Sequence, residues 1–434
     1  MKVNIFWFRR DLRTEDNTGL NKALSSGLPV IAIFIFDKNI TDDLSHDDPR
    51  IGFIYERLLI IDRELREAGS SLGVFTGEPV KVFEDFSAQF DINAVYANKD
   101  YEPYARQRDN YVDLLLKKTN IIFYLYKDQV IFEENELLNA DNKPYIVFTP
   151  YRNRWIQKIK EVSALRTSLK PVFNGRFLKH SYSFPSISDL GFKSSGIVVR
   201  PFDLSVIAEY DKYRDFPPAD RTTYLSPHLR FGTVSIRRIV KKALEENLVF
   251  LGELIWREFF MQILYHFPEV VTGNFKTAYN GIHWRNNERE FLRWCDGETG
   301  YPLVDAGMRQ LNRTGYMHGR VRMITAGFLV KHLLIDWRWG EAYFACKLLD
   351  YEMSSNNGNW QWVAGTGCDA APYFRIFNPE TQRQKFDPQY LYVKKWVEDF
   401  ENTGYPEKIV DHRFAHQRAI SVYKEATKVR YRNY

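Results

Sequence analysis

The sequence is poor in cysteine and lacks the short motifs that mark many metal enzymes. Its three cysteines, Cys295, Cys346 and Cys368, lie far apart and form no CxxC pair. The nine histidines form no HExxH motif. These absences predict a reduced intracellular setting, which we take to be the cytoplasm, and no bound metal.

Long apolar runs and a targeting segment are also absent. No window approaches about 18 uninterrupted apolar residues, so no membrane span is expected. The N-terminus, MKVNIFWFRRDLR, enters a strand pattern directly and has no apolar leader. The net charge is only +5, so composition alone does not indicate a nucleic-acid partner, and the local grouping of Arg and Lys matters more.

The first part of the 434 residues alternates short apolar strands with amphipathic helices. Strands are predicted at residues 3–8, 30–36, 72–76, 94–97 and 121–126. One predicted helix has a single apolar stripe formed by Ile54, Leu58, Ile61, Leu65 and Ala68. This alternation is typical of a parallel, doubly wound α/β sheet. The turn after the first strand reads RRDLR and contains no GxGxxG, which argues against an NAD-binding domain.

The predicted domains are an α/β domain over residues 1–130, a linker over 131–204 and an all-helical domain over 205–434. The linker contains Pro185 and the segment KSSG at residues 193–196, which are typical of a connector that crosses the surface. Helical periodicity is clearest over residues 303–311, 323–334 and 340–349.

Tryptophan is concentrated in the second half of the chain. Eight of the ten tryptophans lie between residues 256 and 396, and residues 356–362 read NNGNWQW, which is not typical of a helix core. Indoles fill cores, stack on flat ligands or carry electrons. The clustering favours a site built from flat rings, although each ring alone is equally compatible with a core position.

Three polar patterns suggest binding chemistry. The segment ELIWREFF puts Glu253, Trp256 and Arg257 on one helical face, which suits a nucleobase; the alternative is a surface Glu253–Arg257 pair with Trp256 in the core. Arg320 and Arg322 follow a glycine-containing turn and are candidates to bind phosphate or to pair with a carboxylate. Asp350 and Glu352 are the candidate carboxylates, and the alternative is a solvated charged face.

The third pattern is TTYLS at residues 222–226, followed by Pro227. It predicts a helix with Ser226 as the N-cap and Pro227 at the first helical position. Hydroxyls and backbone amides at a helix start can hold a phosphate, but most such caps bind nothing.

Together these motifs resemble the photolyase/cryptochrome family, and most closely the class I cyclobutane pyrimidine dimer photolyases. The likeness extends over nearly the whole chain. It is carried by FWFRRDLRTEDN, TTYLSPHLRFG, ELIWREFF, TGYPLVDAGMRQL, RVRMITAGFLVKHLLIDWRWGE and NNGNWQWVAGTGCDAAPYFRIFNP. The resemblance implies an N-terminal α/β domain, a long linker and a helical domain that holds FAD.

The resemblance also implies roles for individual residues. Asn356 matches the residue that faces flavin N5, and Glu253 matches the carboxylate that hydrogen-bonds the dimer. Trp256, Trp362 and Met323 match groups that pack on the flipped lesion. Trp360, Trp337 and Trp284 match the relay that reduces the flavin. The other implied flavin contacts are Tyr210, Thr222, Thr223, Tyr224, Leu225, Ser226, Arg322, Asp350, Tyr351 and Glu352. The implied DNA contacts are Arg214, Arg257, Arg320, Arg375 and Gln382.

Two departures from the family pattern stand out. Gly319 occupies a position where class I enzymes usually carry an Asn that contacts the dimer, so one substrate contact is lost. Residues 100–106, DYEPYAR, lack the Asn-Glu pair of folate-binding members. This segment is more similar to members with a deazaflavin or flavin antenna, and the identity of a second chromophore (deazaflavin, flavin or folate) stays open.

The function that the resemblance implies is light-driven repair of cyclobutane pyrimidine dimers in single- or double-stranded UV-damaged DNA by a monomer. Reduced FADH− would absorb blue light and pass an electron to the dimer, and the electron would return after the ring splits. The main alternative is a cryptochrome-like photoreceptor, which the short C-terminal tail and Asn356 disfavour. Repair of the (6-4) photoproduct is disfavoured because Gly319 follows His318 where two histidines are expected. A flavin-binding relic is disfavoured because Glu253 and Trp256 are both present.

Overall fold

Five parallel strands form one sheet in the N-terminal part of the chain. They are β1 (Val3–Phe8), β2 (Val30–Asp37), β3 (Leu72–Gly77), β4 (Ile92–Asn98) and β5 (Ile122–Tyr126). Their order is β3-β2-β1-β4-β5, and in the central strand Phe6 pairs with Ala32 on one side and with Tyr96 on the other. Every residue of β1 and β2 is buried. All five predicted strands are therefore confirmed, and the sheet is parallel as predicted.

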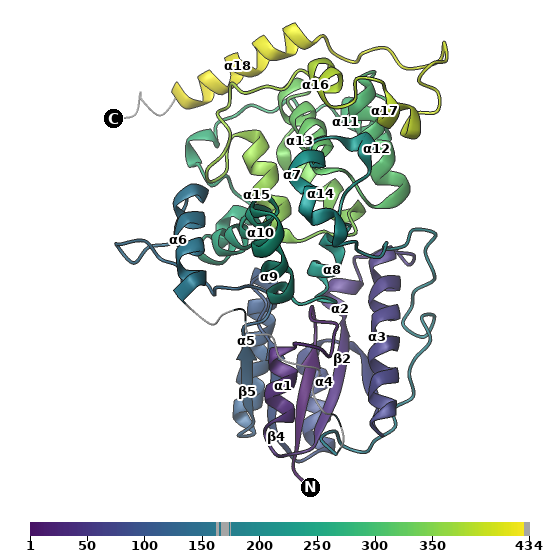
Figure 1. Cartoon of the computed structure of the whole chain (residues 1–434), viewed down its shortest axis with the longest axis vertical. Coiled ribbons are helices and arrows are strands. Elements are labelled where there is room, and N and C mark those ends of the chain that lie inside the picture. Colours follow the sequence, from purple (N-terminus) through teal and green to yellow (C-terminus); the bar gives the residue numbers. More distant parts are fainter. Residues whose placement is uncertain (162–164, 166–172, 174, 429–434) are drawn as a thin grey trace. The chain divides into compact units, whose positions relative to one another are not determined.

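Helices cover both faces of this sheet (Figure 1). They are α1 (Thr18–Leu24), α2 (Lys38–Thr41), α3 (Pro49–Glu67), α4 (Pro79–Gln89) and α5 (Pro103–Lys118). Leu58, Ile61 and Leu65 of the predicted stripe on α3 are buried in one core, and Phe83 of α4 with Leu116 of α5 are buried in the other. The alternation of short apolar strands with amphipathic helices thus produces the three layers of a doubly wound fold.

The computed structural model describes residues 1–161, 165, 173 and 175–428, and they divide into two units. Unit 1 comprises Met1–Leu137, Arg154–Phe202 and Tyr224–Glu245, and it adds the short α8 (Ser226–Arg230) to the sheet and its helices. Unit 2 comprises Leu138–Asn153, Asp203–Thr223 and the chain from Glu246 onward. The domain boundaries expected at residues 130 and 204 stay a prediction.

Unit 2 contains helices and no strand among its described residues. The short helices are η1 (Ser205–Glu209), α7 (Tyr210–Tyr213), η2 (Pro217–Ala219), η3 (Pro268–Val271), η4 (Thr277–Tyr279) and the π-helix η5 (Phe328–His332). The longer ones are α10 (Leu248–His266), α11 (Glu288–Asp296), α12 (Pro302–Thr314), α13 (Gly319–Gly327), α14 (Trp337–Lys347), α15 (Met353–Ala364), α16 (Pro379–Phe386), α17 (Leu391–Trp396) and α18 (His412–Lys428). Within the described part of the chain, no helix has both the length and the apolar character needed to cross a membrane.

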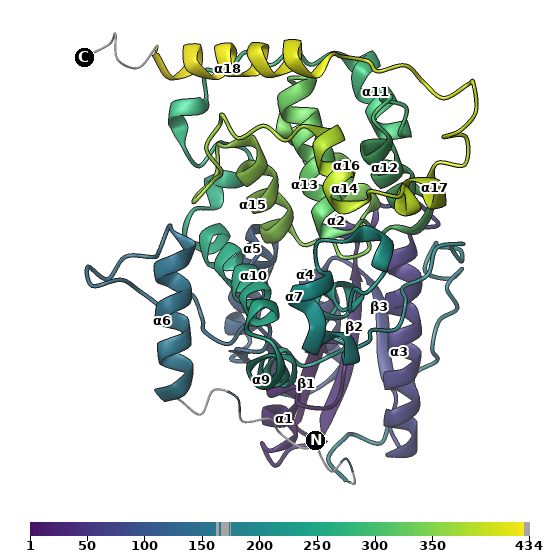
Figure 2. The same cartoon turned by 45° about the horizontal axis from the view of Figure 1, so that its top comes forward.

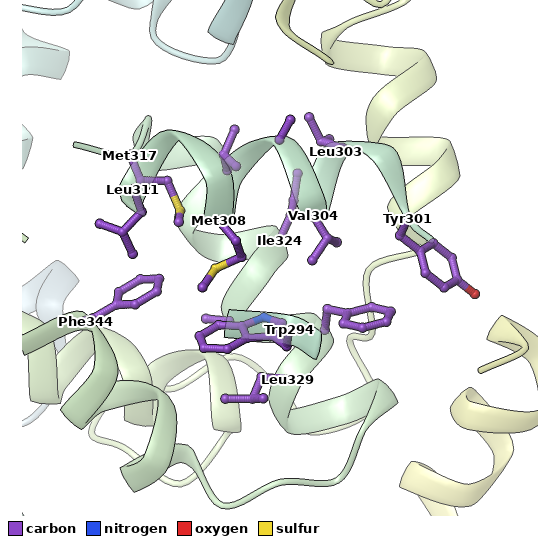
Figure 3. Close-up of a cluster of buried hydrophobic side chains, with 14 of the residues drawn as sticks. Trp294, Tyr301, Leu303, Val304, Met308, Leu311, Met317, Ile324, Leu329 and Phe344 are labelled. Carbon is purple, nitrogen blue, oxygen red and sulfur yellow. The ribbon is translucent and has the colours of Figure 1, made fainter. Parts of the chain in front are cut away.

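The largest core of unit 2 is rich in aromatic rings. Figure 3 shows Trp294 of α11 surrounded by Met308 of α12, Ile324 of α13, Leu329 of η5 and Phe344 of α14. The indole of Trp294 donates a hydrogen bond to the carbonyl of Thr325 (3.0 Å), which satisfies its one polar atom. This core fixes α11 to α14, and α14 contacts the helix α15 that carries the NNGNWQW motif.

Two local predictions are wrong. The connector was expected to cross the surface, but α6 (Phe148–Glu161) forms inside it and buries Tyr151 and Trp155. Part of the connector, residues 162–164, 166–172 and 174, lies outside the described residues. The helix expected over residues 323–334 is also divided, because α13 ends at Gly327 and η5 follows.

Candidate active site

Glu253 and Trp256 are placed by α10, a long helix of unit 2 (Figure 2). Asn247 starts this helix because its side-chain oxygen accepts the backbone N–H groups of Val249 and Phe250, both at 3.0 Å. Trp256 lies three residues after Glu253, and Arg257 lies four residues after it. All three therefore share one side of the helix, as the sequence predicts.

Glu253 pairs with an arginine from another helix segment. Arg214, at the end of α7, places Nη1 2.8 Å from Glu253 Oε1. The two side chains are 32% and 39% exposed, so the pair is open to solvent on one side. Desolvation by the surrounding protein raises the pKa of Glu253, and Arg214 opposes that shift. The site therefore holds a carboxylate that is easier to protonate than an ordinary glutamate.

The alternative Glu253–Arg257 pair is not what the structure shows. Arg257 instead lies with Nε 3.6 Å from Glu352 Oε2, and their side chains are only 13% and 6% exposed. The helical spacing was compatible with both arrangements, and contacts between distant segments decided it. The carboxylate of Glu253 therefore faces Arg214 on the solvent-exposed side of the site.

Trp256 lies against a ring that the sequence did not single out. The ring of Phe148, the first residue of α6, stacks on Trp256 with 3.6 Å between centroids and 8° between planes. Phe260 of α10 also stacks on Trp256, at 5.3 Å and 29°. Phe148 was missed because it lies in a segment predicted to be a connector that crosses the surface, far from its partner in the sequence.

The start of α13 brings together a second group of predicted residues. His318 caps this helix, with Nδ1 3.2 Å from the backbone nitrogen of Arg320, and burial lowers the pKa of His318 to about 4. Arg320 Nη2 donates to Asp215 Oδ1 (2.6 Å), and Arg320 Nη1 lies 3.9 Å from the sulfur of Met323. Asp215 was not predicted as a site residue. At Gly319 an added Cβ would meet no atom within 4 Å.

Arg322 and Asp350 form the pair that the sequence suggested. Arg322 Nη2 donates to Asp350 Oδ2 (2.9 Å), and its Nε donates to the carbonyl of Met317 (2.8 Å). The other carboxylate oxygen, Asp350 Oδ1, is buried and has no hydrogen-bond partner among the described residues. Such an acceptor is costly unless a donor reaches it, so it fits an N–H group of a bound flat heterocycle.

The NNGNWQW segment is helical, although its composition is not typical of a helix core. It belongs to α15, which lies beside α10 (Figure 2). Gln361 Nε2 donates to the carbonyls of Val270 (2.9 Å) and Gly273 (3.1 Å), and Asn357 Nδ2 also donates to Val270 (2.9 Å). These two buried amides therefore hold the chain that follows α10, and they are structural.

Asn356, another amide side chain of α15, contacts Glu341 and not the chain that follows α10. Its Nδ2 donates to the carbonyl of Glu341 (3.0 Å) and to Glu341 Oε1 (2.8 Å). Burial raises the pKa of Glu341, and the hydrogen bond from Asn356 opposes the shift. Because both contacts use the NH₂ group, they fix which way the amide of Asn356 points.

The three indoles predicted as an electron relay all belong to one core cluster. Trp337 and Trp360 are buried in it, and Trp284 is partly buried against it. Trp337 Nε1 donates to Asn274 Oδ1 (2.9 Å). Trp360 also packs within 6.2 Å of Trp294, a buried indole that was not predicted as a site residue. Trp360 and Trp337 are thus both buried in the interior, and Trp284 is the one of the three rings that is partly exposed.

The predicted phosphate cradle is residues 222–226. Thr222 and Thr223 belong to unit 2, and residues 224–226 belong to unit 1. In unit 2 the carbonyl of Thr223 accepts the N–H of Asp203 (2.9 Å). In unit 1 Tyr224 has a positive φ of 50°. The cap prediction is off by one residue: Leu225 is the N-cap of α8 and Ser226 is its first helical residue, with no side-chain capping hydrogen bond.

Of the remaining predicted residues, Tyr210 lies under the guanidinium of Arg214, 5.2 Å from its ring centroid. Tyr210 packs on Phe250 with 5.1 Å between ring centroids, and Tyr351 and Trp362 pack against the aromatic core. Arg375 is exposed in the segment between α15 and α16, and Gln382 is half-buried on α16. The structure therefore joins Arg214 to Glu253, Arg320 to Met323 and Arg322 to Asp350.

Comparison with known proteins agrees with this fold. Residues 4–170 match the model of the DNA photolyase family, and residues 250–404 match the model described as the FAD binding domain of DNA photolyase. A deoxyribodipyrimidine photo-lyase from Halobacterium salinarum is 35% identical over 98% of this chain and 99% of its own length. The chain belongs to the DNA photolyase family.

Solved structures of relatives have the same fold. An archaeal photolyase from Sulfolobus tokodaii, solved with two FAD molecules, is 38% identical with a TM-score of 0.86 over 98% of this chain and all of its own. A class III photolyase from Agrobacterium tumefaciens is 31% identical with a TM-score of 0.88 over 99% and 98% of the two chains. The family expected from the motifs is thereby confirmed.

Proposed function

We propose that this chain is a deoxyribodipyrimidine photo-lyase that uses blue light and FAD to repair cyclobutane pyrimidine dimers in UV-damaged DNA. The observation that carries the proposal is the face of α10 on which Glu253 and Trp256 lie. There a carboxylate with a raised pKa stands on the same side of the helix as a half-buried indole. This combination suits a flipped pyrimidine dimer. The carboxylate can accept an N–H group of a base edge, and the indole can pack on the face of a base.

Residues that the family resemblance assigns to the flavin would hold the FAD. Arg322 and Asp350 would hold the heterocycle, and the partnerless acceptor Asp350 Oδ1 supports this placement. Asn356, fixed by Glu341, would face the flavin ring. The remaining contacts proposed for the dinucleotide are Tyr210, Thr222, Thr223, Tyr224, Leu225, Ser226, Tyr351 and Glu352. When bound, reduced FAD supplies the photoexcited electron that opens the cyclobutane ring.

The damaged strand would bind across the open side of unit 2. Arg214 and Arg320 are half-exposed and can exchange their carboxylate partners for backbone phosphates. Arg257, Arg375 and Gln382 complete the proposed strand contacts. Trp256, Trp362 and Met323 would line the slot for the dimer, and a damaged pair costs less to unstack than an intact one, which adds selectivity.

Trp360, Trp337 and Trp284 would pass electrons from the surface to oxidised flavin. The increase in exposure from Trp360 to Trp284 supports that direction. Trp284→Phe should block photoreduction of the oxidised cofactor, measured as bleaching of its visible absorbance under blue light. The same variant should repair DNA normally after chemical reduction. Normal photoreduction in Trp284→Phe would remove this residue from the relay.

Three further properties form part of the proposal. A second chromophore is supported by the Sulfolobus tokodaii relative with two FAD molecules. A monomer is supported because Glu253, Trp256, Arg322 and Asn356 all come from unit 2 of a single chain. A cytoplasmic setting is supported by three free cysteines.

The decisive experiment is repair of a single-stranded oligonucleotide that contains one thymine dimer. The chemically reduced protein is illuminated with blue light, and a dark sample is the control. Light-dependent return of the two thymines supports a photolyase. Bound and reducible FAD without any repair would contradict the proposal and would favour the photoreceptor alternative.

A further inference from the structure

The ring centroids of Phe148 and Trp256 lie closer together than those of most aromatic pairs in protein cores. With 3.6 Å between centroids and 8° between planes, the two rings are parallel and in direct contact. Phe148 itself is 9% exposed, whereas Trp256 is half-buried and reaches the open side of unit 2. One face of the Trp256 indole, which is proposed to contact the dimer, is therefore covered by a ring from a different segment of the chain.

Phe148 is anchored from a third segment. Its backbone N–H donates to Asp369 Oδ2 (3.1 Å), in the loop that follows α15. Asp369 has a φ of +45°, a left-handed conformation that Asp and Asn tolerate better than other residues with a side chain. A carboxylate at the first amide of α6 also suits the positive end of the helix dipole. The loop thus keeps Phe148 at the start of the helix.

A second contact fixes the same turn of α6 to α10. The hydroxyl of Tyr151 donates to Glu258 Oε1 (3.1 Å), and the Tyr151 ring lies 5.2 Å from that of Phe259. Both contacts are buried. Residues 148 and 151 are therefore held on each side of the ring stack, one by the loop after α15 and one by α10.

An indole on an open surface loses rotamer freedom when it packs on a ligand, and that loss weakens binding. A ring that already stacks on the indole removes this cost before the ligand arrives. We propose that Phe148, held by Asp369, is a positioning residue that fixes the Trp256 indole in the orientation that receives the pyrimidine dimer. The inference rests on the proposed function, because it assumes that Trp256 contacts the dimer.

The test compares the affinity and the repair rate of Phe148→Ala with those of the wild type. An aromatic pair of this kind stabilises by an amount that corresponds to about a threefold to tenfold change in affinity. Phe148→Ala should therefore weaken binding of a dimer-containing oligonucleotide by about threefold to tenfold, with the affinity for the undamaged oligonucleotide unchanged. The repair rate at saturating lesion should also be unchanged. Phe148→Tyr, which keeps a ring, should restore wild-type binding.

Three further variants separate positioning from general stability. In a Trp256→Ala background, Phe148→Ala should have no further effect on lesion affinity. Asp369→Gly should mimic Phe148→Ala, and Asp369→Asn should not, because glycine keeps the left-handed backbone but only asparagine keeps the acceptor oxygen. Phe267→Ala, at the other end of α10 where Phe267 meets Phe275, should leave lesion affinity unchanged.

The outcomes are distinct. Wild-type lesion affinity in Phe148→Ala would overturn the inference, as would an equal loss with and without Trp256. If Phe148→Ala does not fold, the Asp369→Gly and Asp369→Asn pair decides, because it changes only the anchor. A wild-type protein that binds FAD but repairs no dimer would instead contradict the proposed function, whatever these variants show.

Discussion

The two units use charged side chains in opposite ways. In unit 1, Asp128 accepts hydrogen bonds from Arg13 (2.7 Å and 2.8 Å) and Arg237 (2.9 Å), and none of the three side chains is more than 9% exposed. Arg9 and Asp109 form another buried pair, 5% and 7% exposed. These ion pairs form within the unit and are closed to solvent.

In unit 2, two ion pairs of the candidate site remain open to solvent. The Arg214–Glu253 pair is 32% and 39% exposed, and the Arg320–Asp215 pair is 19% and 36% exposed. A half-exposed ion pair contributes little to stability, whereas a closed one is strongly destabilised when a partner is lost. The comparison separates charges that hold the fold from charges that can exchange their partner for a ligand.

The largest effect is expected from breaking the closed network of unit 1. Asp128→Ala leaves Arg13 and Arg237 buried without their common carboxylate. Removal of one member of a buried ion pair typically costs about 3–5 kcal/mol of unfolding free energy. Urea unfolding of the two proteins at neutral pH measures the difference. A loss below about 1 kcal/mol, the size found for surface pairs, would show that the network is not closed.

The pH dependence of this loss gives a second check. Burial alone raises the pKa of Asp128, but Arg13 and Arg237 more than reverse that effect, and the pKa is lowered overall. The stabilisation is therefore complete above the ordinary Asp pKa of about 4 and declines as the pH falls below it. The matched control is Glu15→Ala, because the Glu15–Arg238 pair of the same unit is 54% and 60% exposed. That change should cost less than about 0.5 kcal/mol at any of these pH values.

An intermediate effect, on binding and not on stability, is expected at the open pair of unit 2. Glu253→Gln removes a charged acceptor, and such a hydrogen bond contributes about 1.5–3 kcal/mol, or roughly 10- to 150-fold in affinity for the dimer. The affinity for FAD should stay unchanged. Titration of a dimer-containing oligonucleotide and of FAD measures both. Loss of FAD with retained lesion binding would mean that Glu253 belongs to the cofactor site.

The raised pKa of Glu253 predicts how this effect changes with pH. Because desolvation raises that pKa, the carboxylate protonates at a higher pH than an ordinary glutamate does. Lesion affinity of the wild type should decline as the pH falls through that value, and Glu253→Gln should remove this step. An unchanged step in the variant would assign the titration to another group.

Much of the fold follows from local patterns. The five strands were predicted because short β-branched and aromatic runs are buried on both faces of a parallel sheet. The helix α6 could not be predicted in the same way. Its buried residues, Tyr151 and Trp155, become informative only when their partners Phe259 and Phe132 are known, and these come from distant parts of the sequence.

The candidate site was predicted in its residue types but not in its pairings. Helical spacing put Glu253 and Arg257 together, yet Glu253 pairs with Arg214 and Arg257 lies near Glu352. Asp350 was one of two candidate carboxylates for Arg320 and Arg322, and it pairs with Arg322, whereas the other candidate, Glu352, lies near Arg257. Phe148 and Asp215 had no local pattern, since a single phenylalanine and a single aspartate are common in any connector.

The smallest effect is expected at Gly319, where the open site of unit 2 has space to gain a contact. A Cβ atom added there meets no atom within 4 Å. Gly319→Asn should therefore fold and supply one more hydrogen bond to the dimer, which contributes about 1 kcal/mol, or roughly fivefold tighter lesion binding. The control is Gly52→Asn on α3 of unit 1, where space is also open. Both changes replace a helical glycine and should raise stability slightly, but only Gly319→Asn should tighten binding of the dimer-containing oligonucleotide. Equal lesion affinity in the two variants would place residue 319 outside the substrate slot.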